Sequence, residues 1–171
     1  MELVLPSGRY RESYLEALVE YHAEGRYLDR KPENVDAIVA RLIAMADPAH
    51  VEAGFVPQTT WWLVDGTTYL GRIAIRHELN EELFKSAGHI GYEIRPSQRG
   101  RGLSSRLLAP GLEQAQALGL TRVLLTCCDD NLPSIRVIER NGGQRDEDVQ
   151  IPGANRSERR YWIELGEHPP G

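Results

Sequence analysis

The chain has 171 residues and a mass of 19.3 kDa, which is enough for one domain with a sizeable core and too little for two ordinary ones. Its 41% hydrophobic and 26% charged residues are typical of a globular protein and exclude disordered, collagenous and repeat sequences. The 20 basic and 25 acidic residues give a net charge of -5, which argues against general attraction to nucleic acid. We therefore expect residues 1–171 to form a single domain that does not bind nucleic acid.

The sequence also indicates a cellular compartment. It has no apolar run of the roughly 18 residues that a membrane span needs, and its first residues show no basic region followed by an apolar stretch. The two cysteines, Cys127 and Cys128, are adjacent, so they cannot close an ordinary disulfide loop or supply a zinc cluster. These features predict a cytoplasmic protein without a membrane segment or a metal site.

The first half of the chain predicts helices and then a hairpin. Apolar residues recur at helical spacing over residues 10–24 and again over residues 35–45, so we expect two helices ahead of any strand. Residues 59–64 and 67–76 are rich in β-branched and aromatic side chains. Asp65-Gly66 between them is a strong signal for a tight turn, which predicts an antiparallel hairpin.

The second half of the chain alternates between strand and helix patterns. In chain order, the predicted strands are residues 89–95, 122–127, 144–151 and 159–165, and the predicted helices are residues 103–118 and 133–141. Gly142-Gly143 ends the second of these helices, and the turn-rich residues 152–155 join the last two strands.

The order strand, helix, strand over residues 89–127 predicts a parallel crossover, because such a unit returns its second strand in the same direction. The hairpin and the final strands favour antiparallel pairing. We therefore expect a mixed α/β (α+β) domain with a central, mostly antiparallel sheet, one parallel βαβ crossover and flanking helices.

One segment concentrates positive charge in this acidic chain. Four arginines and no acidic residue lie between Arg95 and Leu112, and the run Arg99-Gly100-Arg101-Gly102-Leu103-Ser104 joins a predicted strand to a predicted helix. Glycines let the backbone approach a ligand, and the first amides of a helix stabilise negative charge. The run therefore predicts a pyrophosphate site, although it matches neither a P-loop nor a dinucleotide-binding motif.

This run resembles the acyl-coenzyme A loop of the GNAT superfamily of acetyltransferases, whose pattern is Gln or Arg, two variable residues, Gly, one variable residue, and Gly or Ala. The sequence differs from this pattern only at the last position, where Ser104 replaces the smaller Gly or Ala. The resemblance continues upstream, where residues 89–96 are similar to the family's fourth strand, and downstream in Asn131-Leu132-Pro133-Ser134. Within the superfamily, the sequence is similar to a group of bacterial predicted acetyltransferases.

The resemblance implies a GNAT-like acyltransferase that uses acetyl-coenzyme A as co-substrate and transfers the acetyl group directly to a primary amine of a small molecule, peptide or protein. It assigns coenzyme binding to Ile94, Arg99, Gly100, Arg101, Gly102, Leu103, Ser104, Asn131 and Ser134. Dimers are common in the family, so a homodimer is a further expectation. The net charge of -5 hints at a cationic acceptor.

A protonated amine must lose its proton before it attacks a thioester, so the reaction needs a base or a chain of waters that ends at one. Three ionisable residues near the predicted site are candidates: His89, Glu78 and Glu93. His89 comes first, because the family often places its base at the start of the fourth strand and an ordinary histidine pKa of ~6.5 is close to neutral. The two glutamates remain alternatives.

The leaving thiolate has no obvious acid. Many relatives carry a tyrosine seven residues after the Asn, and here that position is Ile138. Solvent or another tyrosine, such as Tyr161, would then have to act. Because the usual tyrosine is missing, one alternative function is a coenzyme-binding module without turnover. A second alternative is an acyltransferase that uses another acyl group or a hydroxyl acceptor. Neither cysteine has a base paired with it by sequence, which favours direct transfer over an acetylated enzyme.

Overall fold

A computed structural model describes residues 1–150 and 157–166 of the chain. Its strands form two separate antiparallel sheets. The first sheet has the order β1 (Glu2–Val4), β2 (Gln58–Asp65), β3 (Thr68–Arg76) and β4 (Ile90–Ile94). The second has the order β5 (Arg122–Cys128), β8 (Ser157–Glu164) and β6 (Gln144–Arg145), and β7 (Val149–Gln150) also pairs with β8.

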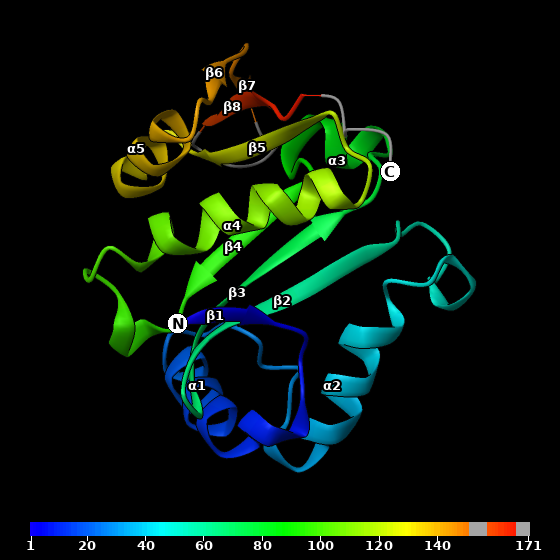
Figure 1. Cartoon of the computed structure of the whole chain (residues 1–171), viewed down its shortest axis with the longest axis vertical. Coiled ribbons are helices and arrows are strands. Elements are labelled where there is room, and N and C mark those ends of the chain that lie inside the picture. Colours follow the sequence, from blue (N-terminus) through cyan, green and yellow to red (C-terminus); the bar gives the residue numbers. More distant parts are fainter. Residues whose placement is uncertain (151–156, 167–171) are drawn as a thin grey trace.

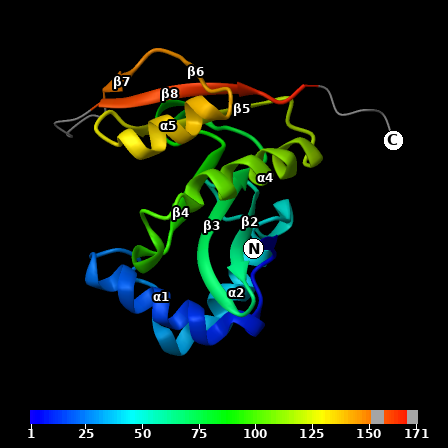
Figure 2. The same ribbon diagram turned by 60° about the vertical axis from the view of Figure 1, so that its left-hand side comes forward.

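The helices lie between and outside the sheets. They are α1 (Arg11–Ala23), α2 (Val35–Ala44), α3 (Glu81–Ser86), α4 (Leu103–Ala117) and α5 (Leu132–Arg140). Figures 1 and 2 show α4 between the two sheets, with α1 and α2 on the opposite face of the first sheet. Within the described residues, no helix combines the length and the apolar composition that a membrane crossing requires.

The predicted hairpin is confirmed. β2 and β3 pair antiparallel, and Asp65 pairs with Thr68 across a turn in which Gly66 has a φ of 60°. A left-handed residue is what a two-residue hairpin turn requires, and glycine adopts it without steric cost. The helices predicted over residues 10–24, 35–45, 103–118 and 133–141 are confirmed as α1, α2, α4 and α5.

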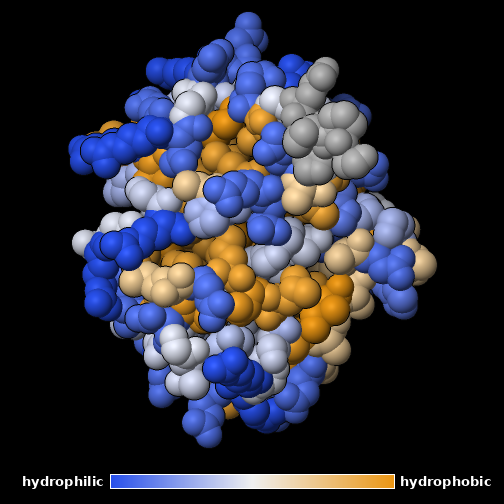
Figure 3. Space-filling model, viewed as in Figure 1, coloured by the Kyte–Doolittle hydropathy of each residue, from blue (hydrophilic) through white to orange (hydrophobic). Residues whose placement is uncertain are grey.

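Each face of the first sheet has its own apolar core. On one face, α4 packs fully buried Leu107 and Leu108 against both sheets. On the other, α1 packs its aromatic residues against β2 and β3, and the rings of Tyr14 and Trp62 stack at 4.6 Å between centroids. Such a pair adds about 0.5–1.5 kcal/mol to the burial of its two rings. Helix α4 covers its face of the first sheet only in part, so Leu3 and Trp61 stay partly exposed. Figure 3 shows apolar surface below that helix.

Two expectations about the chain order need correction, and one helix was not predicted. Strand β1 precedes both helices, so the expectation that two helices come before any strand is wrong. Its three residues are too few for a period-2 pattern to stand out, and it is held by pairing with β2. Helix α3 was not predicted, because its six residues lack an apolar stripe. The strand expected over residues 144–151 is two short strands, with its last residue outside the described part of the chain, as are the turn residues 152–155.

The expected parallel crossover is also not formed in the described residues, where every pairing is antiparallel. Strands β4 and β5 approach each other only near their junction, where the Leu124 carbonyl accepts the His89 backbone N–H at 2.7 Å and Gly88 forms an antiparallel bridge with Leu125. Beyond that point the strands diverge, because α4 fills the space between the two sheets. Within the described ranges, one edge of β4 is therefore free of a neighbouring strand.

Candidate functional site

A cavity of about 570 Å³ lies beside the free edge of β4, between the loop before α4 and the start of α5. Its lining comes from four parts of the chain: Glu24, Arg26, Tyr92, Glu93, Ile94, Gln98, Arg99, Gly100, Gly102, Leu103, Ser104, Asn131, Pro133 and Ser134. Every residue that the sequence assigned to coenzyme binding is among them except Arg101. The fold thus brings the predicted loop, the end of β4 and the start of α5 around one cavity.

The loop presents its backbone to the cavity. Gly100 and Gly102 have φ values of 75° and 71°, and a Cβ atom built at either position meets no atom within 4 Å. Gly102 is the N-cap of α4, and no side chain caps the first amides of this 15-residue helix. Among the described residues, the N–H groups of residues 100–102 donate to no backbone oxygen. Unpaired amides at a helix N-terminus suit a pyrophosphate, so the residues present fit the coenzyme.

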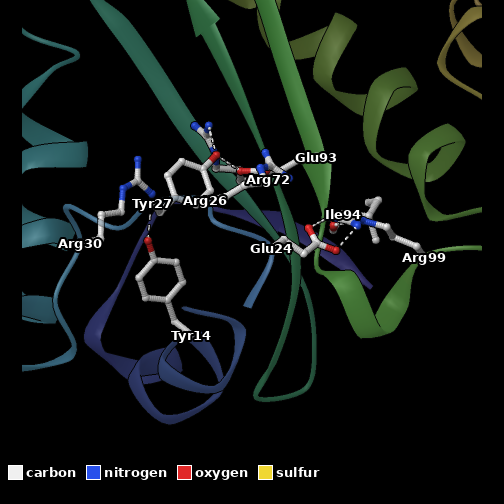
Figure 4. A network of polar contacts seen from close by, with 9 residues as sticks. All are labelled: Tyr14, Glu24, Arg26, Tyr27, Arg30, Arg72, Glu93, Ile94 and Arg99. Carbon is white, nitrogen blue, oxygen red and sulfur yellow. Dashed lines mark hydrogen bonds and ion pairs between the residues drawn. The ribbon is translucent and has the colours of Figure 1, made fainter. Parts of the chain in front are cut away.

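Arg99 is fixed by a carboxylate from the other side of the cavity. Its two terminal nitrogens donate to the Glu24 oxygens at 2.5 and 2.8 Å, and its Nε donates to the Ile94 carbonyl at 3.3 Å (Figure 4). The hydrogen bond to Glu24 is the main cause that raises the pKa of Arg99. Arg101 is exposed and donates to the side chain of Gln98.

The same loop is attached to α1 through Arg95, whose side chain is 8% exposed. Its guanidinium donates to Glu20 at 2.8 Å and to Glu16 at 3.0 Å. Glu20 also accepts the backbone N–H and the hydroxyl of Ser97, both at 2.9 Å. These contacts position the loop relative to α1 before any ligand binds.

A second polar network lies across β4 from the loop and is centred on Glu93 (Figure 4). The Glu93 carboxylate is 9% exposed and accepts hydrogen bonds from Arg72 Nε at 2.6 Å, from Arg26 and from the Tyr27 hydroxyl. Burial alone would raise the pKa of Glu93, but the charge of Arg72 and the hydrogen bonds from Tyr27 and Arg72 outweigh it and lower the pKa below its ordinary value. Glu93 is therefore ionised at neutral pH.

The comparisons with known proteins agree with this geometry. The sequence model of the acetyltransferase (GNAT) domain matches residues 9–144, which is well over half of the chain. The protein belongs to the GNAT acetyltransferase family. A comparison with curated protein sequences finds no significant match.

Solved structures show the same fold as this acetyltransferase at low sequence identity. The microcin C7 self-immunity acetyltransferase MccE, in complex with acetyl-CoA and AMP, is 14% identical with a TM-score of 0.69, over 95% of this chain and 91% of its own. RimL, a ribosomal L7/L12 α-N-protein acetyltransferase in complex with coenzyme A, is 16% identical with a TM-score of 0.66, over 95% and 92% of the two chains. A chimera of the Vibrio cholerae spermidine N-acetyltransferase SpeG and hSSAT is 15% identical with a TM-score of 0.65, over 96% and 97%.

The three candidate bases of the acetyltransferase lie in different surroundings. Only Glu93 lines the cavity, and Glu78 is exposed after the end of β3. His89 is 8% exposed at the β4–β5 junction, where its Nδ1 accepts the Leu124 backbone N–H at 2.9 Å. A neutral ring that accepts at Nδ1 carries its proton on Nε2 and has no lone pair left for a second proton. Burial, and then the charges of Arg76 and Arg122, lower the pKa of His89 to about 4.

Tyr92 lines the acetyltransferase cavity and carries an acidic hydroxyl, although the sequence did not single it out for that role. It comes from β4, lines the cavity together with Asn131 and Ser134, and its buried hydroxyl has no hydrogen-bond partner among the described residues. Ile138 is buried in the core. Tyr161 is fully buried and its hydroxyl contacts Glu139 at 3.4 Å, away from the lining residues.

Sequence reasoning also did not find the contribution of the segment after α1. Glu24 and Arg26 line the cavity, and Tyr27 contacts Glu93, although all three lie far from the loop in sequence. No motif marks them. A surplus of charged residues after an amphipathic helix is too common to indicate a site.

Proposed function

We propose that this protein is an acetyl-CoA-dependent N-acetyltransferase that transfers the acetyl group directly to a primary amine of a small molecule, peptide or protein. The observation that carries the proposal is that one cavity joins the anion-binding loop, the free edge of β4 and the carboxylate of Glu93. This arrangement supports a coenzyme site next to a carboxylate that can bind an ammonium ion.

Coenzyme binding is proposed to use the backbone more than the side chains. The free amides of residues 100–102 and the N-terminus of α4 would hold the pyrophosphate, because they stabilise negative charge without a matching cation. The unpaired edge of β4, up to Ile94, would hydrogen-bond the pantetheine arm. Asn131 and Ser134, at the start of α5, would contact the same arm from the other side.

Glu93 is proposed to receive the amine. When bound, acetyl-coenzyme A supplies the acetyl group as a thioester, and only an uncharged amine can displace the thiolate. The three donors around Glu93 keep it ionised, so it attracts the ammonium form of the acceptor and passes the released proton on to water. His89 is less suited to this step than Glu93, since its Nδ1 lone pair is already used and it lies outside the lining of the cavity.

Tyr92 is proposed as the acid that protonates the leaving thiolate, in place of the tyrosine that Ile138 replaces. Burial raises the pKa of Tyr92 and outweighs the nearby Ser134 side chain, which lowers it, so the Tyr92 hydroxyl keeps its proton at neutral pH. The hydroxyl forms no hydrogen bond by geometry among the residues that the structure describes, and the side chain next to it, Ser134, lines the cavity into which the proton would be donated.

Direct transfer, without an acetylated cysteine, is favoured by the protonation of Cys127. Burial, and then the neighbouring Cys128, raise the pKa of Cys127 to about 11. A thiol with such a pKa is almost entirely protonated at neutral pH, and the thiol form is a poor nucleophile.

The proposal is tested by measuring free thiol after incubation of the protein with acetyl-coenzyme A, with and without a panel of primary amines. We expect coenzyme binding by calorimetry and thiol release that depends on the amine. Coenzyme binding without amine-dependent release would instead identify a binding module. Release with alcohols but not with amines would identify a hydroxyl acceptor.

A further inference from the structure

Gly91 lies in the middle of β4, and its own surroundings do not require a glycine. Nearly every other glycine in the described ranges has a positive φ or would bring a Cβ atom too close to a neighbour. At Gly71, for example, a Cβ atom would lie 2.4 Å from the Glu93 carbonyl oxygen. Gly91 has no positive φ, and a Cβ atom there would meet no atom within 4 Å. Among the described glycines only Gly8, in a short turn near the start of the chain, shares both properties.

A glycine inside a strand weakens the strand, because glycine loses more conformational freedom on folding than other residues. Such glycines typically mark a bulge, a close approach of another backbone segment, or a bound ligand. A bulge is excluded, since the pairing of β3 with β4 runs without a shift from Gly71 opposite Ile94 to Ile75 opposite Ile90. A close backbone approach is excluded by the open space at this position. A ligand is the reason that remains.

The open space lies on the face of β4 that carries Glu93. Alternate residues of a strand share a face, so Gly91 and Glu93 point to one side. Ile90 and Ile94 point to the other side, where they join the core beneath α4. Gly91 and Glu93 are ~6.6 Å apart along the strand at ~3.3 Å per residue. The register partner of Gly91 is Ala74, so a methyl group borders the same space.

The candidate coenzyme cavity reaches this face of the sheet. Glu93 lines the cavity, and so do Glu24 and Arg26 from the segment after α1. Tyr92 and Ile94, which alternate with Glu93 along β4, line it as well. The cavity therefore extends around the free edge of β4. A molecule that lies over the middle of β4 would have one end beside Glu93 and close to a thioester held along that edge.

The Glu93 carboxylate has room for one more donor. It accepts from Arg72 Nε at 2.6 Å, from Arg26 and from the Tyr27 hydroxyl. A carboxylate offers about four acceptor sites, so about one remains for an ammonium group. The three donors come from the β3 side and from the segment after α1, whereas the side toward Gly91 is open.

We propose that Gly91 determines which acceptors the enzyme accepts: the aliphatic carbon next to the acceptor's amine lies over Gly91, and the amine lies beside Glu93. This inference rests on the proposed function and specifies its acceptor site. The absent side chain leaves room for the carbon, and the methyl group of Ala74 is its apolar neighbour. The substrate class is an aliphatic primary amine. An arylamine would place a wide, rigid ring where this carbon lies.

The test compares Gly91→Ala and Gly91→Leu with the unmodified protein. The acceptors are butylamine, spermidine, Nα-acetyl-L-lysine and the peptide Ala-Ala-Ala, with 4-aminobenzoate as the arylamine. For the accepted amines, kcat/KM should fall about threefold in Gly91→Ala and about 30-fold or more in Gly91→Leu, because a side chain fills the space of the acceptor. In Gly91→Ala the loss should lie in KM, with kcat retained. Coenzyme A affinity, measured by calorimetry, should be unchanged in both variants.

Thermal unfolding supplies a readout that needs no acceptor. Gly91→Ala should unfold at the same or a higher temperature than the unmodified protein, because alanine loses less conformational freedom on folding. Gly8→Ala and Gly8→Leu are the matched controls, since Gly8 also has open space and no positive φ but does not line the cavity. Both Gly8 variants should retain kcat/KM. Gly91→Ser takes the place of Gly91→Leu should leucine prevent folding.

Three results would overturn the inference. The first is an unchanged KM for the amines in the Gly91 variants, and the second is a lower unfolding temperature of Gly91→Ala, which would show a structural role. The third is a preference of the unmodified protein for 4-aminobenzoate over the aliphatic amines. Failure of the proposed function would look different. The unmodified protein itself would then release no thiol from acetyl-coenzyme A with any amine, and the inference would fall with it.

Discussion

The carboxylate of Glu24 binds both terminal nitrogens of Arg99, at 2.5 and 2.8 Å, on the wall of the coenzyme cavity. Glu24 thus holds the arginine that we expect to contact a phosphate of the coenzyme. Glu24→Gln should tighten coenzyme A binding by about twofold to fivefold, since a partly exposed ion pair contributes up to ~1 kcal/mol. Arg99→Ala should weaken binding by about tenfold. Calorimetry measures both affinities.

The control for Glu24 is Glu16→Gln, which removes an exposed carboxylate from Arg95 but not from the cavity. We expect coenzyme affinity to be unchanged in this variant. Weaker binding of coenzyme A by Glu24→Gln would contradict the idea that Glu24 and the coenzyme compete for Arg99. It would show instead that the ion pair supports the coenzyme site.

Gly102→Val should abolish coenzyme binding and leave the fold intact. The side chain would enter the open space at the start of α4, where the pyrophosphate is expected, and the left-handed φ of 71° adds backbone strain. Gly119→Val is the matched control, because Gly119 also has a left-handed φ, of 88°, and open space, but lies beyond the other end of α4. Both variants should unfold at similar temperatures, and only Gly102→Val should lose coenzyme A binding. Equal affinities of the two variants for coenzyme A would show that the loop is not part of the coenzyme site.

The sequence was most informative where interactions between residues close together in the chain decide the structure. The Asp65-Gly66 turn, the four longer helices and the glycine loop each depend on neighbours in the chain, and each was predicted. The contacts between Glu24 and Arg99, and between Tyr27 and Glu93, join residues more than 60 positions apart. No local pattern encodes such contacts, because they depend on how α1 packs against the first sheet.

Strand pairing shows the same limit. A strand, helix, strand order predicts a crossover, but whether the two strands pair depends on how far apart the helix between them holds the sheets. Here α4 holds β4 and β5 apart, so a free strand edge and a cavity exist where pairing was expected. That difference creates the candidate site. Proximity in sequence also favoured His89 as the base, whereas its environment is set by Leu124 from another strand.

His89 should affect stability at acidic pH. Its pKa is lowered from 6.5 to about 4 in the folded protein, so the unfolded chain binds the proton more tightly. Stability should therefore fall as the pH decreases from about 6.5 to about 4, by on the order of 2 kcal/mol once solvent screening is allowed for. His89→Gln should remove this part of the pH dependence, because the glutamine amide does not titrate. Urea unfolding at several pH values measures the difference.

The same variant separates structure from catalysis. If His89 only holds the β4–β5 junction, the pH profile of the turnover number should keep its shape in His89→Gln. Loss of an acidic limb near pH 4, where the lowered pKa of His89 places its titration, with a turnover number about 10² lower, would identify His89 as the base instead.

Tyr92→Phe should lower the turnover number by about 10-fold to 100-fold with little change in coenzyme affinity, because it removes only the hydroxyl proposed to protonate the thiolate. Tyr161→Phe is the control, since that hydroxyl contacts Glu139 outside the cavity lining. An acyl donor with a more acidic thiol needs the acid less, so it should restore part of the activity of Tyr92→Phe. Equal activity of the two variants would show that solvent protonates the thiolate.

The central claim is that the acetyl group passes directly from the coenzyme to an amine bound beside Glu93. The most direct measurement is mass spectrometry of the protein and the products after one equivalent of acetyl-coenzyme A is added, first without and then with the amine panel. We predict an unmodified protein without amine, and equal amounts of coenzyme A and N-acetylated amine with it, formed about 10² times more slowly by Glu93→Gln. An acetyl group on Cys127 or Cys128, or release of acetate with no acetylated amine, would contradict the account.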